Sequence, residues 1–373
     1  MTGGYIKMRF MIFIILSGLF WVSGTAFPGS DAGTSAKISL RAKAGAYYFD
    51  GWTTGSGHIT ERLKMEFGDR EPVWGWNDDT LPIVEQQIDC AADGGLAFFA
   101  FDWYYPEGPD KECPLNTGLN LYLKAHNRSR LEFCLLVANH SGFRIGPKDW
   151  DAVCDIWIGL FKQPTHLKLN GKPLIIFFSA RELLNSFETT DTLKSAFNRL
   201  REKARSAGIE GVQIAVCATP GPKWDWDNLN LLASAGFDCF TGYNYHGHPR
   251  KGAYSIQEYA WMIEGHEDIW NLFAKRSTIP YIPVVTTGWD MRPWEAPDAK
   301  KRSVYYPDRT PPQLADFVRR AIRWMDVHPE KTTRERILLL YAWNENGEGG
   351  YLTPLKSTGA AYLNAVQDAL LGL

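Results

Sequence analysis

The chain has 373 residues and 45% of them are apolar, so it can bury a large core. Its formal net charge is −2 and no basic run stands out, which argues against nucleic acid as a partner. Aromatic residues make up 14% of the chain, with 15 Trp and 16 Tyr. This richness fits either flat faces offered to sugar rings or a large aromatic core.

The N-terminal residues 1–26 have the pattern of a secretory signal peptide. Lys7 and Arg9 precede an apolar run over 10–22, and small residues follow it up to Ala26. The run is too short to span a bilayer comfortably, so we expect cleavage after Ala26. The protein is therefore expected to be exported to the periplasm or the extracellular space.

Residues 27–43 are small, polar and lysine-containing and predict a linker, so the mature domain is expected to span 44–373. No other apolar stretch is long enough to cross a membrane, and we expect no membrane span in the mature chain. From residue 44 onward, continuous apolar runs alternate with helical stretches, as expected of parallel strands covered on both faces. The predicted strands are 44–50, 96–103, 132–138, 173–178, 212–217, 238–243, 282–287 and 337–343.

Helical patterns lie between these strands, at 81–92, 191–207, 312–327 and 359–371 among others. Eight strands with helices between them are closed most economically as a single right-handed (β/α)8 barrel, an α/β fold. An open, doubly wound sheet is the alternative. No strand is followed by G-x-G-x-x-G or a P-loop, which disfavours that alternative, and we expect no cofactor.

The six cysteines match neither a metal knuckle nor a compact disulfide scaffold. Cys134, Cys217 and Cys239 fall in predicted strands, where buried free thiols are expected. Cys113 and Cys154 could form a disulfide, since an exported protein permits one.

In such a barrel, the side chains that carry chemistry lie where strands end and the following loops begin. Aromatic rings, carboxylates and amides gather at these positions, so we expect a carbohydrate as the ligand. The candidate residues are Tyr47, Tyr48, Asp50, Trp52, Asp102, Trp103, Tyr104, Asn139, His140, Tyr243, Tyr245, His246, Trp289, Asp290, Arg292, Asn344, Glu345 and Glu348.

Two of these candidates, Glu345 and Glu348, lie on a glycine-rich loop directly after the eighth predicted strand. Glycosidic bond cleavage needs one group that protonates the leaving oxygen and another that acts at or near the anomeric carbon. Two carboxylates in different environments can divide those roles, because one of them can be kept protonated. The alternative is a solvated turn that Gly347, Gly349 and Gly350 make flexible.

Asp102 and Asp290 follow predicted strands in the same way, and each could orient a sugar hydroxyl or tune a glutamate. Either could instead pair with Arg292 as structural support. His246, like the histidine after the third strand, is a candidate hydroxyl ligand or proton carrier. His246 and His248 have no carboxylate at metal-ligand spacing beside them, so we expect no metal. No G-x-S-x-G elbow supports a serine nucleophile.

Taken together, these segments resemble the glycoside hydrolase family 99 and 71-like barrels, including the WbsX-like proteins. GAYYFDGW resembles the opening strand of that group, and QQIDCAADGGLAFFAFDWYYPEG resembles the helix and strand that follow. LEFCLLVANH, LNGKPLIIFF and VVTTGWDMRPW resemble its third strand, its G-K-P strand and its G-W-D-x-x-P segment. WNENGEG is similar to the N-E-W-x-E-G signature after the last strand.

The resemblance implies a retaining hydrolase that cleaves an α-linked oligo- or polysaccharide through a 1,2-anhydro sugar. On this chain, Glu345 would deprotonate the 2-hydroxyl, which attacks the anomeric carbon. Glu348 would protonate the leaving oxygen and later activate water. The chain departs from the signature at Asn346, where Trp is usual, and at Thr353, where Glu is common. The first departure is expected to remove a wall or stacking residue near the sugar.

Two other functions stay open. One is a glycosyltransferase-associated role in surface polysaccharide assembly, a label attached to some WbsX-like proteins. The signal pattern disfavours it, since nucleotide-sugar donors are cytoplasmic and no phosphate-binding loop is visible. The other is a carbohydrate-binding barrel without catalysis, and the presence of both Glu345 and Glu348 argues against it.

Overall fold

The structure is a computed structural model that describes residues 40–108, 112–218, 229–246, 255–296, 299 and 303–373. The predicted signal peptide and most of the predicted linker lie outside these residues. The last residues of that linker already belong to the folded unit. Arg41 forms an ion pair with Asp326 at 2.7 Å, and Lys43 is the first residue of strand β1.

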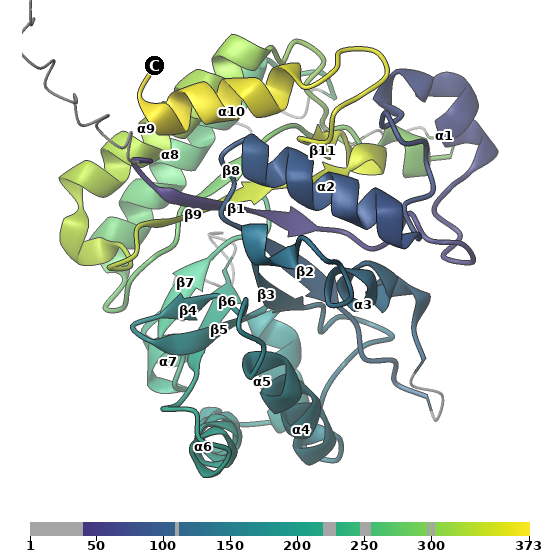
Figure 1. The fold of residues 1–373 in the computed structure, drawn as a ribbon. Coiled ribbons are helices and arrows are strands. Elements are labelled where there is room, and N and C mark those ends of the chain that lie inside the picture. The colour runs from purple at the N-terminus through teal and green to yellow at the C-terminus, as the bar shows by residue number, and fades with distance from the viewer. Residues whose placement is uncertain (1–39, 109–111, 219–228, 247–254, 297–298, 300–302) are drawn as a thin grey trace, which may run out of the picture. The chain divides into compact units, whose positions relative to one another are not determined.

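Within the described residues, eight parallel strands run in the order β7-β6-β5-β3-β2-β1-β9-β8 (Figure 1). They are β1 (Lys43–Tyr48), β2 (Phe98–Trp103), β3 (Glu132–Val137), β5 (Lys172–Phe177), β6 (Gln213–Cys217), β7 (Cys239–Thr241), β8 (Val284–Thr286) and β9 (Ile337–Tyr341). The ring closes just before β8, where Phe240 pairs with Tyr281 and the backbone N of Ile282 donates to Phe240 O at 2.8 Å. The predicted α/β barrel is confirmed.

The helices lie outside the strands (Figure 1). They are α1 (Glu61–Glu66), α2 (Leu81–Asp93), α3 (Thr117–Tyr122), α4 (Trp150–Phe161), α5 (Ala180–Phe187), α6 (Thr190–Ser206), α7 (Leu229–Ser234), α8 (Tyr259–Arg276), α9 (Pro311–Val327) and α10 (Ala361–Leu371). The four helices predicted by range correspond to α2, α6, α9 and α10. In α6, Leu193, Phe197, Leu200 and Ala204 are buried at three- and four-residue spacing, as an amphipathic helix on a core requires.

Several strands are shorter than the sequence predicts. The predicted strand 337–343 pairs only to Tyr341, and the predicted strands 238–243 and 282–287 shrink to three paired residues each. Most residues of the predicted ranges that do not pair are still apolar, because they pack at the strand ends. Trp343, for example, is fully buried and its backbone N donates to Tyr47 O at 2.7 Å.

The connection between β1 and α2 builds a second, smaller apolar cluster. Its buried members are Phe49, Trp52, Leu63, Phe67 and Trp76. This connection also bonds to the segment after the last strand, since Val73 N donates to Pro354 O at 2.9 Å. It therefore lies over the loops that follow β8 and β9.

All six cysteines are free thiols. Cys134, Cys217 and Cys239 are buried, as expected from their places in strands. The possible Cys113–Cys154 disulfide is not formed: Cys154 is buried on α4 and Cys113 is partly buried. None of the described helices combines the length and the apolarity that a bilayer crossing requires.

Candidate active site

The segment after β9 folds into a small hairpin. β10 (Asn344–Glu345) pairs antiparallel with β11 (Gly350–Tyr351). A 3-10 turn over Asn346–Glu348 connects the two short strands. We call residues 344–351 the glutamate loop. The loop follows the carboxyl end of β9, at the edge of the barrel that we call the rim.

The glycines of the glutamate loop allow close packing. A Cβ at Gly349, whose φ is 74°, would lie 2.9 Å from the backbone N of Asp290. A Cβ at Gly350 would lie 2.5 Å from the ring of Tyr341. Asp290 N also donates to Glu348 O at 2.6 Å. The loop is thus bonded and packed on both sides, unlike a solvated turn.

Glu345 is buried, with 5% of its surface exposed, and it accepts a hydrogen bond from a tyrosine. The hydroxyl of Tyr243 lies 2.7 Å from Oε1 of Glu345. The same hydroxyl lies 2.8 Å from Oδ2 of Asp102, at the end of β2. Three predicted site residues from three different strand ends therefore meet at one hydroxyl.

Glu348 has a tyrosine of its own. The hydroxyl of Tyr341, the last residue of β9, donates to Oε2 of Glu348. The rings of Tyr341 and Tyr243 lie 4.9 Å apart in an edge-to-face arrangement. The two glutamates are therefore held by two tyrosines that pack against each other. Glu348 is only partly buried, which leaves it more accessible than Glu345.

Burial dominates the electrostatics of this group. It raises the pKa of Glu345 well above its usual value, and the charges of Glu348 and Asp102 raise it further. The pKa of Glu348 is raised mainly by burial, while the bond from Tyr341 opposes that shift. The pKa of Asp102 is also raised well above its usual value by burial. Carboxyls placed this close lose their protons one after another, so one can stay protonated while another is ionised.

Asp290 is a structural ion-pair partner on the far side of the loop. Arg292 Nη2 lies 2.7 Å from Asp290 Oδ2, and Arg70 Nη2 bonds the same oxygen. Burial alone would raise the pKa of Asp290, but the bonds and charges of the two arginines hold it below its usual value. The sequence left open whether Asp290 pairs with Arg292 as structural support, and the structure contains this ion pair.

Arg70 holds the glutamate loop itself. Its Nη1 donates to Asp290 O at 3.0 Å, and it lies 3.4 Å from Asn346 O and 3.5 Å from Gly347 O. These last two carbonyls stand between the two glutamates. Arg70 thus ties the β1–α2 connection to the loops after β8 and β9.

Beside the glutamates, His246 and Trp289 form a flat pair, with ring centroids 3.6 Å apart and planes at 9°. Burial lowers the pKa of His246 to about 4, so its ring is neutral near pH 7. Trp289 lies 6.1 Å from the ring of Tyr341. Within the described residues no cluster of His, Cys, Asp and Glu could hold a metal ion, and His248 lies outside those residues.

Two more predicted residues, Tyr47 and Tyr104, stand around Tyr243 and Asp102, and a third, His140, lies beside Tyr104. The ring of Tyr47 lies 5.0 Å from that of Tyr243. Tyr104 is buried, and its pKa is raised first by burial and next by the charge of Asp102. The ring of His140 lies 6.1 Å from that of Tyr104.

Asn344 and Trp52 hold the start of the glutamate loop in place. The side-chain amide of Asn344 accepts from Phe49 N at 2.8 Å and donates to Phe49 O at 2.7 Å. Trp52 Nε1 donates to Asn344 O at 2.5 Å. These bonds occupy the side-chain amide of Asn344 and the indole nitrogen of Trp52, so both residues support the start of the glutamate loop.

Tyr48 and Asp50 also lie behind the rim. Tyr48 is fully buried and its hydroxyl donates to Asp78 Oδ2 at 3.3 Å. Asp50 accepts from the backbone N of Gly118, and its other oxygen is buried without a partner among the described residues.

Three predicted residues are not brought to the glutamates. Trp103 packs edge-on against a tryptophan of α4 at 5.7 Å, because neighbouring residues of a strand point to opposite faces. The Asn139 amide bonds to the backbone O of Ser179 at 2.8 Å. The hydroxyl of Tyr245 lies 3.0 Å from that of Tyr281 in the core.

Two residues of the site were missed. Tyr341 is the last residue of an apolar strand that ends at the rim, and that position was a usable signal. Arg70 carries no sequence signal, since its partners lie more than two hundred positions away.

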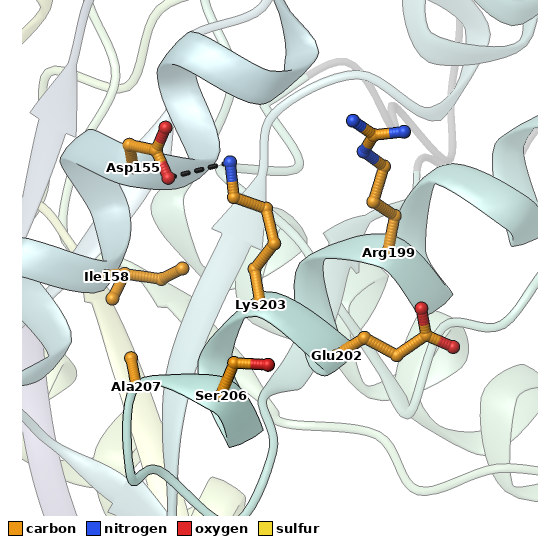
Figure 2. A pocket seen from close by; sticks show the side chains of 7 residues that line it. All are labelled: Asp155, Ile158, Arg199, Glu202, Lys203, Ser206 and Ala207. Carbon is orange, nitrogen blue, oxygen red and sulfur yellow. Dashed lines mark ion pairs between the residues drawn. The ribbon is translucent and has the colours of Figure 1, made fainter.

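A surface hollow lies elsewhere, between α4 and α6 on the outside of the barrel (Figure 2). Lys203 pairs there with Asp155 at 2.7 Å. The residues that line it are Asp155, Ile158, Arg199, Glu202, Lys203, Ser206 and Ala207. None of the predicted site residues is among them, so the hollow is separate from the glutamates.

Solved structures share this fold. A "glycoside hydrolase-like protein" superposes with a TM-score of 0.62 at 15% identity, covering 93% of this chain and 97% of that one. A GH99 endo-alpha-mannosidase from Bacteroides thetaiotaomicron superposes with a TM-score of 0.59 at 12% identity, covering 88% and 96%. Its complex with bis-tris-propane gives 0.56 at 13% identity, covering 90% and 98%.

No curated protein matches the chain. A family model matches residues 76–366, which include every strand from β2 onward and the whole glutamate loop. The model is described as "Glycosyltransferase WbsX". The chain therefore belongs to the WbsX family and has a barrel of the GH99 type.

Proposed function

We propose that the protein is a glycoside hydrolase that cleaves an α-linked oligo- or polysaccharide with retention, through a 1,2-anhydro sugar. One observation carries the proposal. Two glutamates lie three positions apart at the rim, Glu345 buried and Glu348 partly buried, and each is bonded to its own tyrosine hydroxyl. A glycosidase needs two carboxyls that divide the roles of acid and base, and carboxyls in different environments can do so.

In the first step, Glu345 is the base and Glu348 is the acid. Glu345 takes the proton of the substrate 2-hydroxyl, and that oxygen attacks the anomeric carbon. The bond from the anomeric carbon to the leaving oxygen breaks, and Glu348 gives its proton to that oxygen. Burial raises the pKa of Glu348, which favours the protonated form that a general acid needs.

In the second step the roles reverse. Glu348, now ionised, takes a proton from water, and the water oxygen attacks the anomeric carbon. The three-membered ring opens, and its oxygen regains the proton from Glu345. Two displacements at one carbon restore its original configuration, so the product retains the anomeric form of the substrate.

This chemistry limits the substrate. An in-line attack by the 2-oxygen requires that it and the leaving oxygen lie on opposite faces of the ring. Among α-linked pyranosides, manno-configured sugars meet this condition and gluco-configured sugars do not. We therefore propose an α-manno-configured residue on the glycone side.

We also propose that the protein is exported, on the strength of the pattern in residues 1–26. Mass determination of the secreted chain would test the cleavage after Ala26. The family description names a glycosyltransferase, so transfer of a sugar to an acceptor is the alternative to hydrolysis.

The experiment compares hydrolysis with transfer. The full chain is incubated in ¹⁸O-water with a panel of α-linked glycans, with and without sugar nucleotides, and products are read by mass spectrometry and proton NMR. Hydrolysis places ¹⁸O on the anomeric carbon of the new reducing end, and we expect the α-anomer first. Release of nucleotide from a sugar nucleotide, with no ¹⁸O in any glycan, would favour the transferase. A β-anomer as the first product would refute the retaining mechanism.

A further inference from the structure

The hydroxyl of Tyr243 stands between two carboxyl groups. It lies 2.8 Å from Asp102 Oδ2 and 2.7 Å from Glu345 Oε1, and both distances are those of an O–H···O hydrogen bond. A phenol has a single hydrogen and can donate only one such bond. If both carboxyls were ionised, one contact would be oxygen against oxygen with no proton between them. The cluster therefore requires a second proton.

The surroundings of Asp102 favour that carboxyl as its holder. Asp102 is 4% exposed, and its Oδ1 is buried with no hydrogen-bond partner in the described part of the chain. The titratable groups that face it there are Asp50, Tyr104, Cys217, Tyr243, Tyr341, Glu345 and Glu348. Each of these groups is neutral or negative, so an ionised Asp102 would be a buried charge without compensation.

We propose that Asp102 keeps a proton during the reaction and donates it to Tyr243, so that the Tyr243 hydroxyl donates in turn to Glu345. Asp102 is then a positioning residue that acts on the base through Tyr243. The proposal rests on the proposed role of Glu345. A proton on Glu345 instead would leave that residue unable to accept the proton of the 2-hydroxyl.

This hydrogen-bond chain has two consequences for Glu345. The directed hydroxyl fixes one carboxylate oxygen and leaves the other for the substrate, and it stabilises the ionised form of a buried base. Successive hydrogen bonds also polarise one another, so the protonated Asp102 strengthens the bond from Tyr243 to Glu345. The raised pKa of Asp102, caused mainly by burial, agrees with the same assignment.

The activity test compares two isosteric substitutions. Asp102→Asn keeps a neutral donor next to the Tyr243 oxygen, and we expect kcat within about threefold of wild type. Asp102→Leu removes the donor, and we expect kcat to fall roughly tenfold with little change in KM, the upper end for a lost hydrogen bond between neutral groups. Equal loss in both variants would overturn the proposal, since it would mean that Asp102 acts as a carboxylate.

A second test needs no activity. The pKa of Asp102 is higher in the folded than in the unfolded state, so the wild type loses stability, relative to Asp102→Asn, as pH rises toward the folded pKa. Urea unfolding at a series of pH values from about 5 upward should show the ratio of their unfolding constants changing with pH, by up to about tenfold per pH unit below the folded pKa of Asp102. Asp290→Asn, at an ionised ion-paired carboxylate, is the matched control and should show no such trend.

The two tests separate the possible failures. A flat pH response for Asp102→Asn would overturn the neutral Asp102 whether or not the protein is a hydrolase. The expected pH response, in a protein that cleaves no glycan, would refute the proposed function and with it the positioning role. The expected pH response with an inactive Asp102→Asn would overturn the positioning role alone.

Discussion

The side-chain amide of Asn346 donates to Oγ1 of Thr353 at 3.2 Å, and so joins the two positions at which the chain departs from the N-E-W-x-E-G signature and the segment after it. Asn346 is fully buried and also donates to Arg70 O at 2.8 Å. From the sequence, Asn346 was expected to remove a wall residue near the sugar. The structure places the Asn346 side chain inside the protein beneath the glutamate loop, and the loss of a wall residue stays a prediction.

Replacement of Asn346 by Ala should therefore affect stability more than specificity. Arg70 O and Thr353 would lose a buried partner, and we expect the free energy of unfolding to fall by about 1–3 kcal/mol. Urea unfolding of Asn346→Ala, Thr353→Val and the double variant would measure the coupling between them. We expect the ratios of kcat/KM among cleaved glycans to stay unchanged, and a tenfold shift in any ratio would restore the sugar-wall interpretation.

Replacement of Arg70 by Met should damage both stability and turnover. The carbonyls between the two glutamates would lose their guanidinium, and Asp290 would keep only Arg292. We expect a loss of about 3 kcal/mol, as for a broken buried pair, and a kcat lowered roughly 10- to 100-fold by displaced carboxylates.

The matched control for that variant is Arg62→Met, because Arg62 also lies over the Phe67 ring but bonds to Glu66 and Glu295 instead of the glutamate loop. We expect its kcat to stay near that of wild type. If Arg70→Met turned over as fast as Arg62→Met, Arg70 would have no part in placing the glutamates.

Replacement of Tyr341 by Phe should move the alkaline limb of the pH–rate profile. The bond from Tyr341 favours ionised Glu348, so its loss raises the pKa of that carboxyl. Because Glu348 must be protonated in the first step, the activity of Tyr341→Phe should persist to higher pH than that of wild type. An alkaline limb that stayed in place, measured on kcat/KM, would remove Glu348 from the role of general acid.

Asp78 should make the stability of the protein depend on pH. Burial raises its pKa to about 7, while Tyr48, Gln87 and Asn344 donate to it. A carboxyl whose pKa is raised by folding stabilises the fold at pH values below its unfolded pKa. That contribution is lost as the pH rises to about 7. The free energy of unfolding of Asp78→Asn, relative to that of wild type, should rise by roughly 1.4 kcal/mol per pH unit between about pH 4 and 7.

The neighbouring Asp79 provides the control for that measurement, since it is only partly buried and bonds to Thr54 outweigh burial and lower its pKa. Denaturant unfolding at several pH values should show that the free energy of unfolding of Asp79→Asn changes with pH as that of wild type does above pH 5. If the free energy of unfolding of Asp78→Asn also changed with pH as that of wild type does, Asp78 would be ionised in the folded protein.

The barrel could be predicted because its strands are continuous apolar runs, and the strand ends then placed Asp102, Tyr243 and Glu345 at one rim. The same pattern could not say which neighbour at a strand end faces inward, so Trp103 was assigned to the sugar together with Asp102. Only the pairing register decides between two such neighbours. The pattern also predicted strands that are too long. Apolar residues that pack at the rim follow the last paired residue, and the sequence does not distinguish them from paired ones.

The support behind the glutamates could not be predicted. Arg70 belongs to a connection whose sequence is irregular, and its bonds reach residues 220 and 276 positions away. The hairpin of β10 and β11 is only two residues long on each side, which gives no periodicity to detect. Contacts of this kind depend on the closed barrel, which brings distant loops together.

The most direct test of the site is the initial rate of glycan cleavage by Glu345→Gln and Glu348→Gln beside wild type. Glu107→Gln, at an exposed glutamate paired with Arg144 in the loop after β2, is the matched control. We expect the control to cleave as wild type does, and each loop variant to lose roughly a hundredfold or more in kcat with its unfolding midpoint preserved. Full activity in either folded loop variant would contradict the assignment of that glutamate.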